Sequence, residues 1–210
     1  MTCKHVWLLH PQSLWAEHMR VNIKKIFGKF DLGFVLDKHS LYSIPTGHDE
    51  YGHMLFDTRR SDAGEALYQL KYRQQWQYVL PLARAIQSSI LPLLPAFGLI
   101  IPMAASAGRA VQPVTAVADM LGQITGKPVF ELLRKTASGP ALKDLHVRSE
   151  KEVALAGTLT LNRLITNTGR WNALLLDDLY HTGATLDAAS DVLRTYEKIG
   201  QIYVAALTWR

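Results

Sequence analysis

The stretch WNALLLDDLYHTGATLDAASDVLRTYEKIGQIYVAALTW, residues 171–209, decides the fold. It begins with an apolar run, 171–178, that ends in two acids, and it closes with a second apolar run, 202–209. Between the two runs, a short glycine-containing turn leads into a segment with apolar residues at helical spacing. These residues are Leu186, Ala189, Leu193 and Tyr196. A strand, a helix and a strand in this order predict two parallel strands joined by a right-handed crossover.

The same alternation of strands and helices extends toward the N-terminus. Two helices are predicted from Ser61 onward and over 79–93, and a third runs from Pro113 to Gly126. Further strands are predicted within 33–44 and over 97–103, 128–133 and 154–165, whereas the polar and basic residues 134–152 read as a loop. We therefore expect an α/β fold in which helices flank a parallel sheet.

Length and composition agree with a single globular unit. The chain has 210 residues, 48% of them hydrophobic, which suits one core of residues 61–210 with a small N-terminal hood of residues 1–60. Cys3 is the only cysteine, which excludes a disulfide framework and a cysteine-rich zinc site and favours a reducing compartment. The formal net charge of +5 favours anionic partners such as nucleotides, polyphosphates or nucleic acid, although a mildly basic surface explains it equally well.

The sequence contains no pattern typical of secretion or of a membrane span. The N-terminal residues lack a long apolar segment followed by a small-residue cleavage site. The most hydrophobic stretch, 79–107, is interrupted by Arg84 and by four prolines, so it does not suit a bilayer. We expect a cytoplasmic protein without a membrane partner.

Residues 177–185 carry the chemistry. Asp177 and Asp178 end the strand over 171–178, and ligands of open α/β sheets bind at the carboxyl ends of strands. Two carboxylates accept hydrogen bonds from the two hydroxyls of a ribose. The turn His181-Thr182-Gly183-Ala184-Thr185 then points backbone N–H groups and a helix N-terminus at one place, which favours a phosphate. Together these features suit a ribose 5-phosphate.

A second interpretation of the acid pair stays open at this point. A hydrophobic strand that ends in Asp-Asp also occurs in Mg²⁺-dependent phosphotransfer sites and in response receivers. Such a site needs further acids on another strand, and no such pattern follows residue 97.

The stretch DDLYHTGATL (177–186) resembles the phosphoribosyl pyrophosphate (PRPP) motif of the type I phosphoribosyltransferases, which has four apolar residues, two acids and a turn ending in Thr-Gly-x-Thr. Two further stretches, FDTRRSDAGEALYQLKYR (56–73) and IIPM with its small-residue loop (100–106), narrow the resemblance to the ComF-like branch. The chain departs from that branch in three respects. It lacks the cysteine-rich zinc ribbon, it has His181 where threonine is common, and it reads GRAVQP at 108–113 where many members have an Arg-Gly-Phe-Asn-Gln run.

The resemblance implies a role for each matching position. Asp177 and Asp178 would hold the ribose hydroxyls, directly or through Mg²⁺, and residues His181, Thr182, Gly183, Ala184 and Thr185 would bind the 5-phosphate. The backbone of Ala104, Ala105 and Ser106 would approach the pyrophosphate. Lys135, Lys143 and Arg148 would close over it, although a solvated basic loop is an equally good interpretation of these three. Mg²⁺ is the implied cofactor.

The implied reaction is the displacement of pyrophosphate from ribose C1 by a nitrogen nucleophile. The alternative is a non-catalytic regulator that binds a sugar phosphate, or an accessory protein of DNA uptake that binds single-stranded DNA. A homodimer is common among proteins of this kind. Lys71 either reaches the sheet edge and supports the site or is a solvated helix terminus.

Overall fold

A five-stranded sheet forms the centre of the protein in a computed structural model, which describes residues 19–104, 111–135 and 158–210. Its strands lie in the order β1-β2-β9-β8-β5. Their bounds are β1 Lys24–Ile26, β2 Leu32–Lys38, β9 Ile199–Trp209, β8 Trp171–Tyr180 and β5 Leu99–Pro102. All neighbouring strands are parallel except β1, which is antiparallel to β2. The expected α/β class, a parallel sheet flanked by helices, is confirmed.

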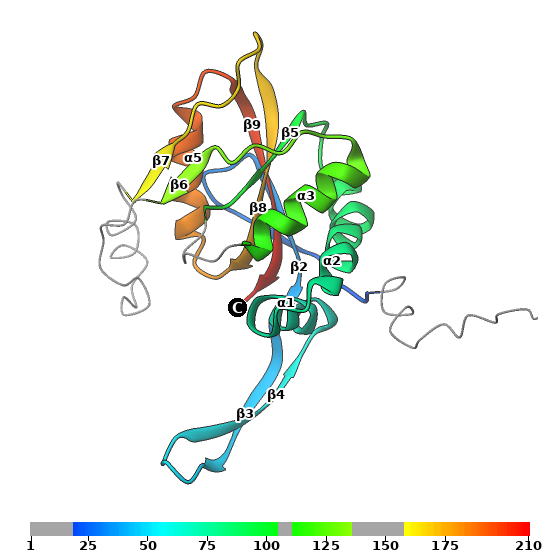
Figure 1. Ribbon diagram of the computed structural model, residues 1–210, viewed down its shortest axis with the longest axis vertical. Coiled ribbons are helices and arrows are strands. Elements are labelled where there is room, and N and C mark those ends of the chain that lie inside the picture. The colour runs from blue at the N-terminus through cyan, green and yellow to red at the C-terminus, as the bar shows by residue number, and fades with distance from the viewer. Residues whose placement is uncertain (1–18, 105–110, 136–157) are drawn as a thin grey trace, which may run out of the picture.

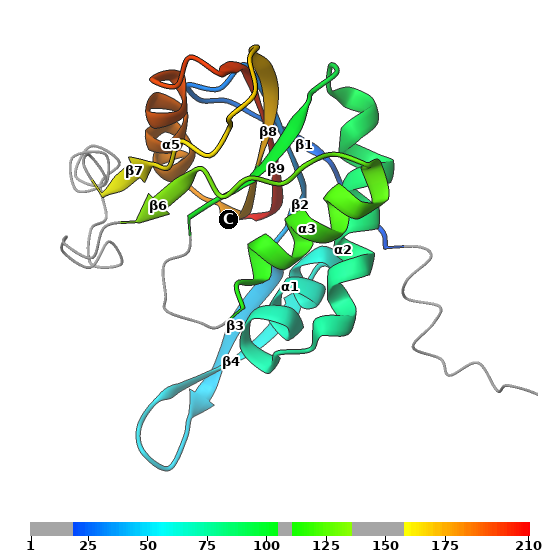
Figure 2. The same ribbon diagram turned by 45° about the horizontal axis from the view of Figure 1, so that its top comes forward.

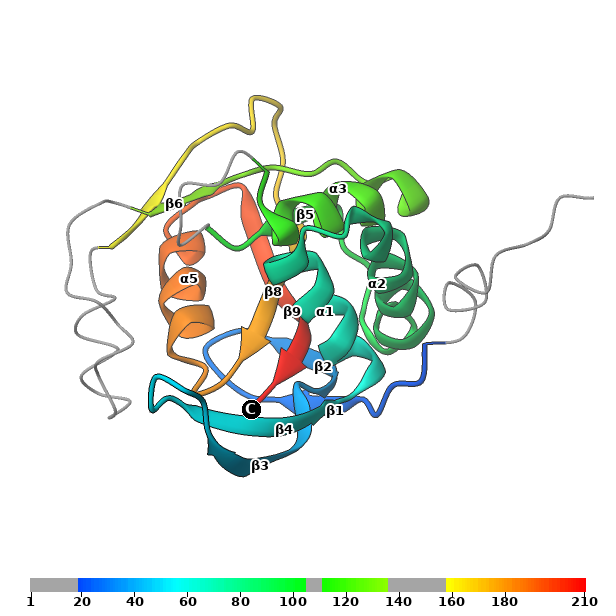
Figure 3. The same cartoon turned by 60° about the horizontal axis from the view of Figure 1, so that its bottom comes forward.

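Helices cover both faces of this sheet (Figure 1, Figure 3). Helices α1 (Asp62–Arg73), α2 (Val79–Ala85) and α3 (Pro113–Thr125) pack on one face, and α5 (Ala184–Arg194) packs on the other. The side chains of β8 alternate between the two cores. Leu174 and Leu176 join the core beneath α1–α3, whereas Ala173 and Leu175 join the core beneath α5. The continuous apolar runs in the sequence reflect this burial on both faces.

The helix ends follow the local chemistry of the sequence. The Ser61 side chain accepts a hydrogen bond from the Gly64 N–H at 3.0 Å and so caps α1. A proline begins α3, and Gly126 ends it in the left-handed conformation with φ of 67°. The predicted helix over 79–93 continues beyond α2 as a π-helical turn, Ile86–Ile90, and a 3₁₀ turn, Leu91–Leu93. Another 3₁₀ turn, Trp76–Tyr78, precedes α2.

The prediction of a strand over 128–133 is wrong, since this segment joins the sheet only through a single β-bridge at Val129. Val129 pairs in parallel with Ile100, and the chain then leaves the sheet. Ile100 donates its N–H to the Pro128 carbonyl, and the Phe130 N–H donates to the Ile100 carbonyl. Continuing the ladder needs an N–H two residues further along β5, where Pro102 has none. Leu133–Lys135 instead forms β6, which pairs with β7 (Leu159–Leu161) in a separate antiparallel ribbon.

Residues 19–60 contribute to two different parts of the fold. Strands β1 and β2 belong to the main sheet, although residues 1–60 were expected to form a hood. The hairpin of β3 (Ser40–His48) and β4 (Met54–Arg60) projects away from the sheet (Figure 1, Figure 2). Helix α1 returns directly against its root, where a Cβ on Gly64 would overlap the His39 carbonyl oxygen. Only glycine therefore permits this approach of helix and strand end.

Within the described ranges, no helix has the length and hydrophobicity that crossing a membrane requires.

Candidate functional site

The carboxyl end of β8 carries the two acids that the sequence singled out. Asp177 is 7% exposed, and its Oδ1 accepts a hydrogen bond from the Asp178 N–H at 2.8 Å. Successive side chains of a strand point to opposite faces, so Asp177 follows Ala173 and Leu175 to the α5 face. Asp178 follows Leu174 and Leu176 to the face of α1. The acid pair therefore lies at the ligand edge of the sheet, with one carboxylate toward each layer of helices.

The electrostatics of Asp177 differ from those of an ordinary carboxylate. Burial and then the negative charge of Asp178 raise its pKa to about 7. The backbone N–H of Asp178 and the charges of Lys71 and Lys135 act in the opposite direction on this pKa. These groups do not fully offset the effect of burial and of Asp178, so the ionised form of Asp177 remains disfavoured. A bound cation would meet that need.

Lys71 supports the site from the last turn of α1. Its Nζ lies 2.5 Å from Asp178 Oδ2, and the two side chains are only 29% and 20% exposed. Of the two interpretations of Lys71, the geometry agrees with reach to the sheet edge and contradicts a solvated helix terminus. The sequence alone left both interpretations open, because the periodicity of a helix does not show where the long side chain of a lysine ends.

Breaking this ion pair is expected to reduce stability. The Lys71→Met variant should lower the free energy of unfolding by roughly 1–3 kcal/mol, between the values typical of exposed and of buried pairs. A double-mutant cycle with Asp178→Asn, measured by urea unfolding, should give a coupling energy of at least about 1 kcal/mol. Arg73→Met, in the same turn but exposed, is the matched control and should show no coupling to Asp178. A cycle for Lys71 that closes to zero would contradict the pair.

Two residues that the sequence analysis did not identify lie behind the acid pair. Thr208 Oγ1 donates to the Asp178 carbonyl at 3.1 Å and lies 3.2 Å from His39 Nδ1. A hydroxyl has one proton to donate, so His39 Nδ1 must carry a proton and donate to Thr208. Burial, followed by the charges of Arg210, Arg60 and Lys71, lowers the pKa of His39 to about 4. His39 is therefore neutral at pH 7 and holds the end of β9 against β8.

The turn after β8 has the conformation that a glycine allows. Gly183 has φ of 83° and directly precedes the first residue of α5, Ala184. The Ala184 N–H donates to Thr182 Oγ1 at 3.4 Å. The Asp187 N–H donates to the Gly183 carbonyl, which is the first hydrogen bond of the helical pattern. His181 is exposed and Thr185 is half-buried. Backbone N–H groups and a helix N-terminus thus follow the acid pair within seven residues, at the same edge of the sheet.

The remaining predicted site residues divide into two groups. Ala104 lies just beyond the carboxyl end of β5, next to β8 in the sheet, and Lys135 ends β6 with its charge acting on Asp177. The other four, Ala105, Ser106, Lys143 and Arg148, lie outside the described residues. For a metal, the described part of the chain holds no cluster of three or more His, Cys, Asp or Glu side chains. The protein groups suited to a cation there are the two carboxylates of Asp177 and Asp178.

Comparisons with known proteins give similarity at the level of structure alone. No protein-family model matches the chain, and no curated protein matches its sequence. Similar solved structures include the adenine phosphoribosyltransferase of Saccharomyces cerevisiae, at 11% identity and a TM-score of 0.40, covering 79% of this chain and 84% of that one. The enzyme of Thermoanaerobacter pseudethanolicus aligns at 15% identity and 0.40, covering 80% and 95%. That of Leishmania tarentolae aligns at 10% identity and 0.43, covering 86% and 78%.

Proposed function

We propose that this protein binds PRPP as a type I phosphoribosyltransferase of the ComF-like branch, and that it transfers the phosphoribosyl group to a nitrogen acceptor. One observation carries the proposal. The carboxyl end of β8 presents Asp177 and Asp178, and the next turn and the N-terminus of α5 follow at the same sheet edge. Acceptors for two ribose hydroxyls and donors for a phosphate are thereby combined in one short segment.

Each part of the segment has its own task in the proposal. The backbone N–H groups of 183–185 bind the 5-phosphate, and Thr182 and His181 border it. The carboxylates of Asp177 and Asp178 accept hydrogen bonds from the ribose hydroxyls. Lys71 pairs with the Asp178 carboxylate and so fixes its position, and His39 with Thr208 fixes the backbone beneath it. The ribose is thus oriented before reaction, and orientation supplies a large share of catalysis in such displacements.

Mg²⁺ fits the residues at this site. Mg²⁺ prefers oxygen ligands and is often bound through one or two carboxylates together with substrate phosphates. Asp177 and Asp178 supply that number of carboxylates, and the raised pKa of Asp177 marks a local deficit of positive charge. When bound, the ion would neutralise charge on the departing pyrophosphate.

The proposed reaction breaks the bond between ribose C1 and the pyrophosphate oxygen and forms a bond from C1 to the acceptor nitrogen. The bonding electron pair leaves with pyrophosphate, and the acceptor nitrogen loses a proton to solvent. Lys135, Lys143 and Arg148 are proposed to stabilise the leaving pyrophosphate, and the backbone of Ala104, Ala105 and Ser106 to contact it. Lys135 has support from its charge, which acts on Asp177.

Calorimetric titration of PRPP into the full chain, with and without Mg²⁺, tests the proposal. We expect saturable binding that Mg²⁺ strengthens, with weaker binding of ribose 5-phosphate and of pyrophosphate used separately as partial ligands. A folded protein that ignores millimolar PRPP would overturn the proposal. Binding of PRPP without pyrophosphate release in an acceptor screen would favour the non-catalytic regulator. Salt-sensitive binding of single-stranded DNA in place of PRPP would favour the DNA-uptake role.

A further inference from the structure

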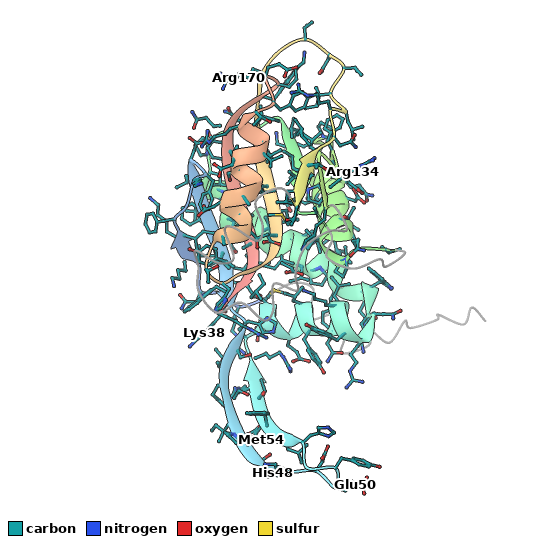
Figure 4. All side chains as sticks on the ribbon, turned by 90° about the vertical axis from the view of Figure 1, so that its left-hand side faces the viewer. Lys38, His48, Glu50, Met54, Arg134 and Arg170 are labelled. Carbon is teal, nitrogen blue, oxygen red and sulfur yellow. The ribbon has the colours of Figure 1, made fainter. Side chains whose placement is uncertain are left out.

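The root of the β3–β4 hairpin brings positive side chains to the carboxyl ends of β2 and β9. Arg60 ends β4 and pairs across the hairpin with Ser40, the residue after His39. Arg210 directly follows β9. Figure 4 shows Lys38, the residue before His39, where the hairpin leaves the body of the protein. The root therefore lies at the same sheet edge as the acid pair on β8.

The pKa of His39 shows which charges surround this place. After burial, the largest effects on that pKa come from Arg210, Arg60 and Lys71, and all three lower it. Only Asp178 acts in the opposite direction. Charges shift a pKa in this way only when they lie close by. Since Lys71 is already paired with Asp178, Arg60 and Arg210 are the cations left to bind a ligand there.

Arg60 is held in one orientation while most of its donors are unused. Its guanidinium carbon lies 3.7 Å from the centroid of the Tyr68 ring on α1, and its Nη1 donates to Glu65 Oε2 at 3.2 Å. Glu65 is the only acceptor that the described residues offer to this guanidinium. Its Nε is the one buried side-chain polar atom of the described ranges without a hydrogen-bond partner, which costs free energy. A guanidinium in this state favours a carboxylate, which can accept from two of its N–H groups at once.

These cations lie on the side of the acid pair from which an acceptor would approach. In the proposed reaction the pyrophosphate leaves toward the end of β5, which Ala104 follows. The nucleophile attacks C1 from the side opposite to the leaving group. Strand β8 has β5 on one side and β9 with β2 on the other, so the acceptor approaches from the carboxyl ends of β9 and β2. Arg210 follows the first of these ends, and His39, with Arg60 beside it, follows the second.

We propose that the nitrogen acceptor is an anion, a compound that carries a carboxylate besides its nucleophilic nitrogen, and that Arg60 and Arg210 bind this carboxylate. The inference rests on the proposed function, because it assigns the chemical class of the acceptor. One carboxylate suits the charges present. Lys71 is balanced by Asp178, and Glu65 binds one nitrogen of Arg60. Arg210 is exposed and forms no ion pair with a described residue. A neutral acceptor would cover these cations without balancing them, which is unfavourable.

Matched pairs of a carboxylate and its neutral carboxamide test the inference. The probes are nicotinate, anthranilate and imidazole-4-carboxylate, each with its carboxamide. They are titrated into the full chain by calorimetry and then supplied as acceptors in a pyrophosphate-release assay with PRPP and Mg²⁺. We expect at least one carboxylate to bind roughly 10-fold more tightly than its carboxamide and to release pyrophosphate, because hydrogen bonds to a charged group are the stronger ones. No carboxylate binding at millimolar concentration, or a carboxamide that binds as well as its carboxylate, would overturn the inference.

Variants of the two arginines locate the carboxylate. Arg60→Gln and Arg210→Gln should each weaken carboxylate binding roughly 10-fold and leave PRPP affinity within about twofold of the wild type. Arg59→Gln is the matched control, since Arg59 is exposed on the opposite face of the hairpin, and it should change neither affinity. Arg60→Gln also removes the contact with Tyr68, whereas Arg210→Gln breaks no ion pair within the described residues. Carboxylate affinity that both variants keep would overturn the inference alone. A wild type that does not bind PRPP would overturn the proposed function and, with it, the acceptor role.

Discussion

The variant Asp177→Asn/Asp178→Asn is expected to lose PRPP binding by at least about 100-fold while it keeps its fold. Each charge-assisted hydrogen bond contributes roughly 1.5–3 kcal/mol, and the two carboxylates would make at least one each to the ribose. Asparagine preserves the shape of the side chains but accepts less strongly and cannot bind a cation as a carboxylate does. Isothermal titration calorimetry with Mg²⁺ present measures the loss.

Asp191→Asn provides the control for this prediction. Asp191 lies on α5 and forms an exposed ion pair with Lys29, away from the strand end. Its replacement should leave PRPP affinity within about twofold of the wild type, since surface substitutions have small effects. If the double variant still bound PRPP as the wild type does, the acid pair would have no part in the site.

The second large effect concerns pH and His39. Its pKa in the folded protein is about 4, whereas an unfolded histidine titrates near 6.5. Between these values the unfolded chain binds a proton that the folded protein does not. His39 therefore contributes stability that is fully present above pH 6.5 and is lost as the pH falls through 4, by up to about 3 kcal/mol.

Urea unfolding of the wild type and of His39→Asn at pH 7, 5.5 and 4.5 measures this contribution. Asparagine can still donate to Thr208 but does not titrate, so the difference in stability between the two proteins should shrink as the pH falls. The free energy of unfolding of the wild type alone should depend less on pH than this difference does, because the titration of Asp177 acts in the opposite direction. Asp177, with its raised pKa, binds a proton in the folded state and so favours folding at low pH. A difference that stays constant across the three pH values would contradict the buried, neutral His39.

Sequence reasoning succeeded where one local rule decided the outcome. The apolar run 171–178 and the glycine turn after it favour a buried strand followed by α5, because a short apolar run bounded by turn residues is typical of a strand covered on both faces. The helix from Ser61 and the stop at Gly126 depend on caps that act within one turn. The class of fold and the place of the acid pair follow from these elements alone.

It failed where the outcome depends on contacts distant in sequence. The strand over 128–133 has a suitable composition, but the missing N–H that ends it belongs to Pro102 on another segment. Lys71 and Asp178 are 107 residues apart, and His39 and Thr208 are 169 apart. Neither pair forms a recognisable motif, because parallel strands bring their ends together only after the whole sheet has formed.

Pro102 also affects how the protein behaves at high concentration. An unpaired sheet edge can recruit a strand from another molecule, which leads to aggregation. On the β5 side, Pro102 has no backbone N–H to offer to an added strand, and Ile100 already pairs with Val129. On the other side, β1 has only three residues, two of which are the exposed Lys24 and Lys25. The main sheet thus resists growth by strand addition at both borders.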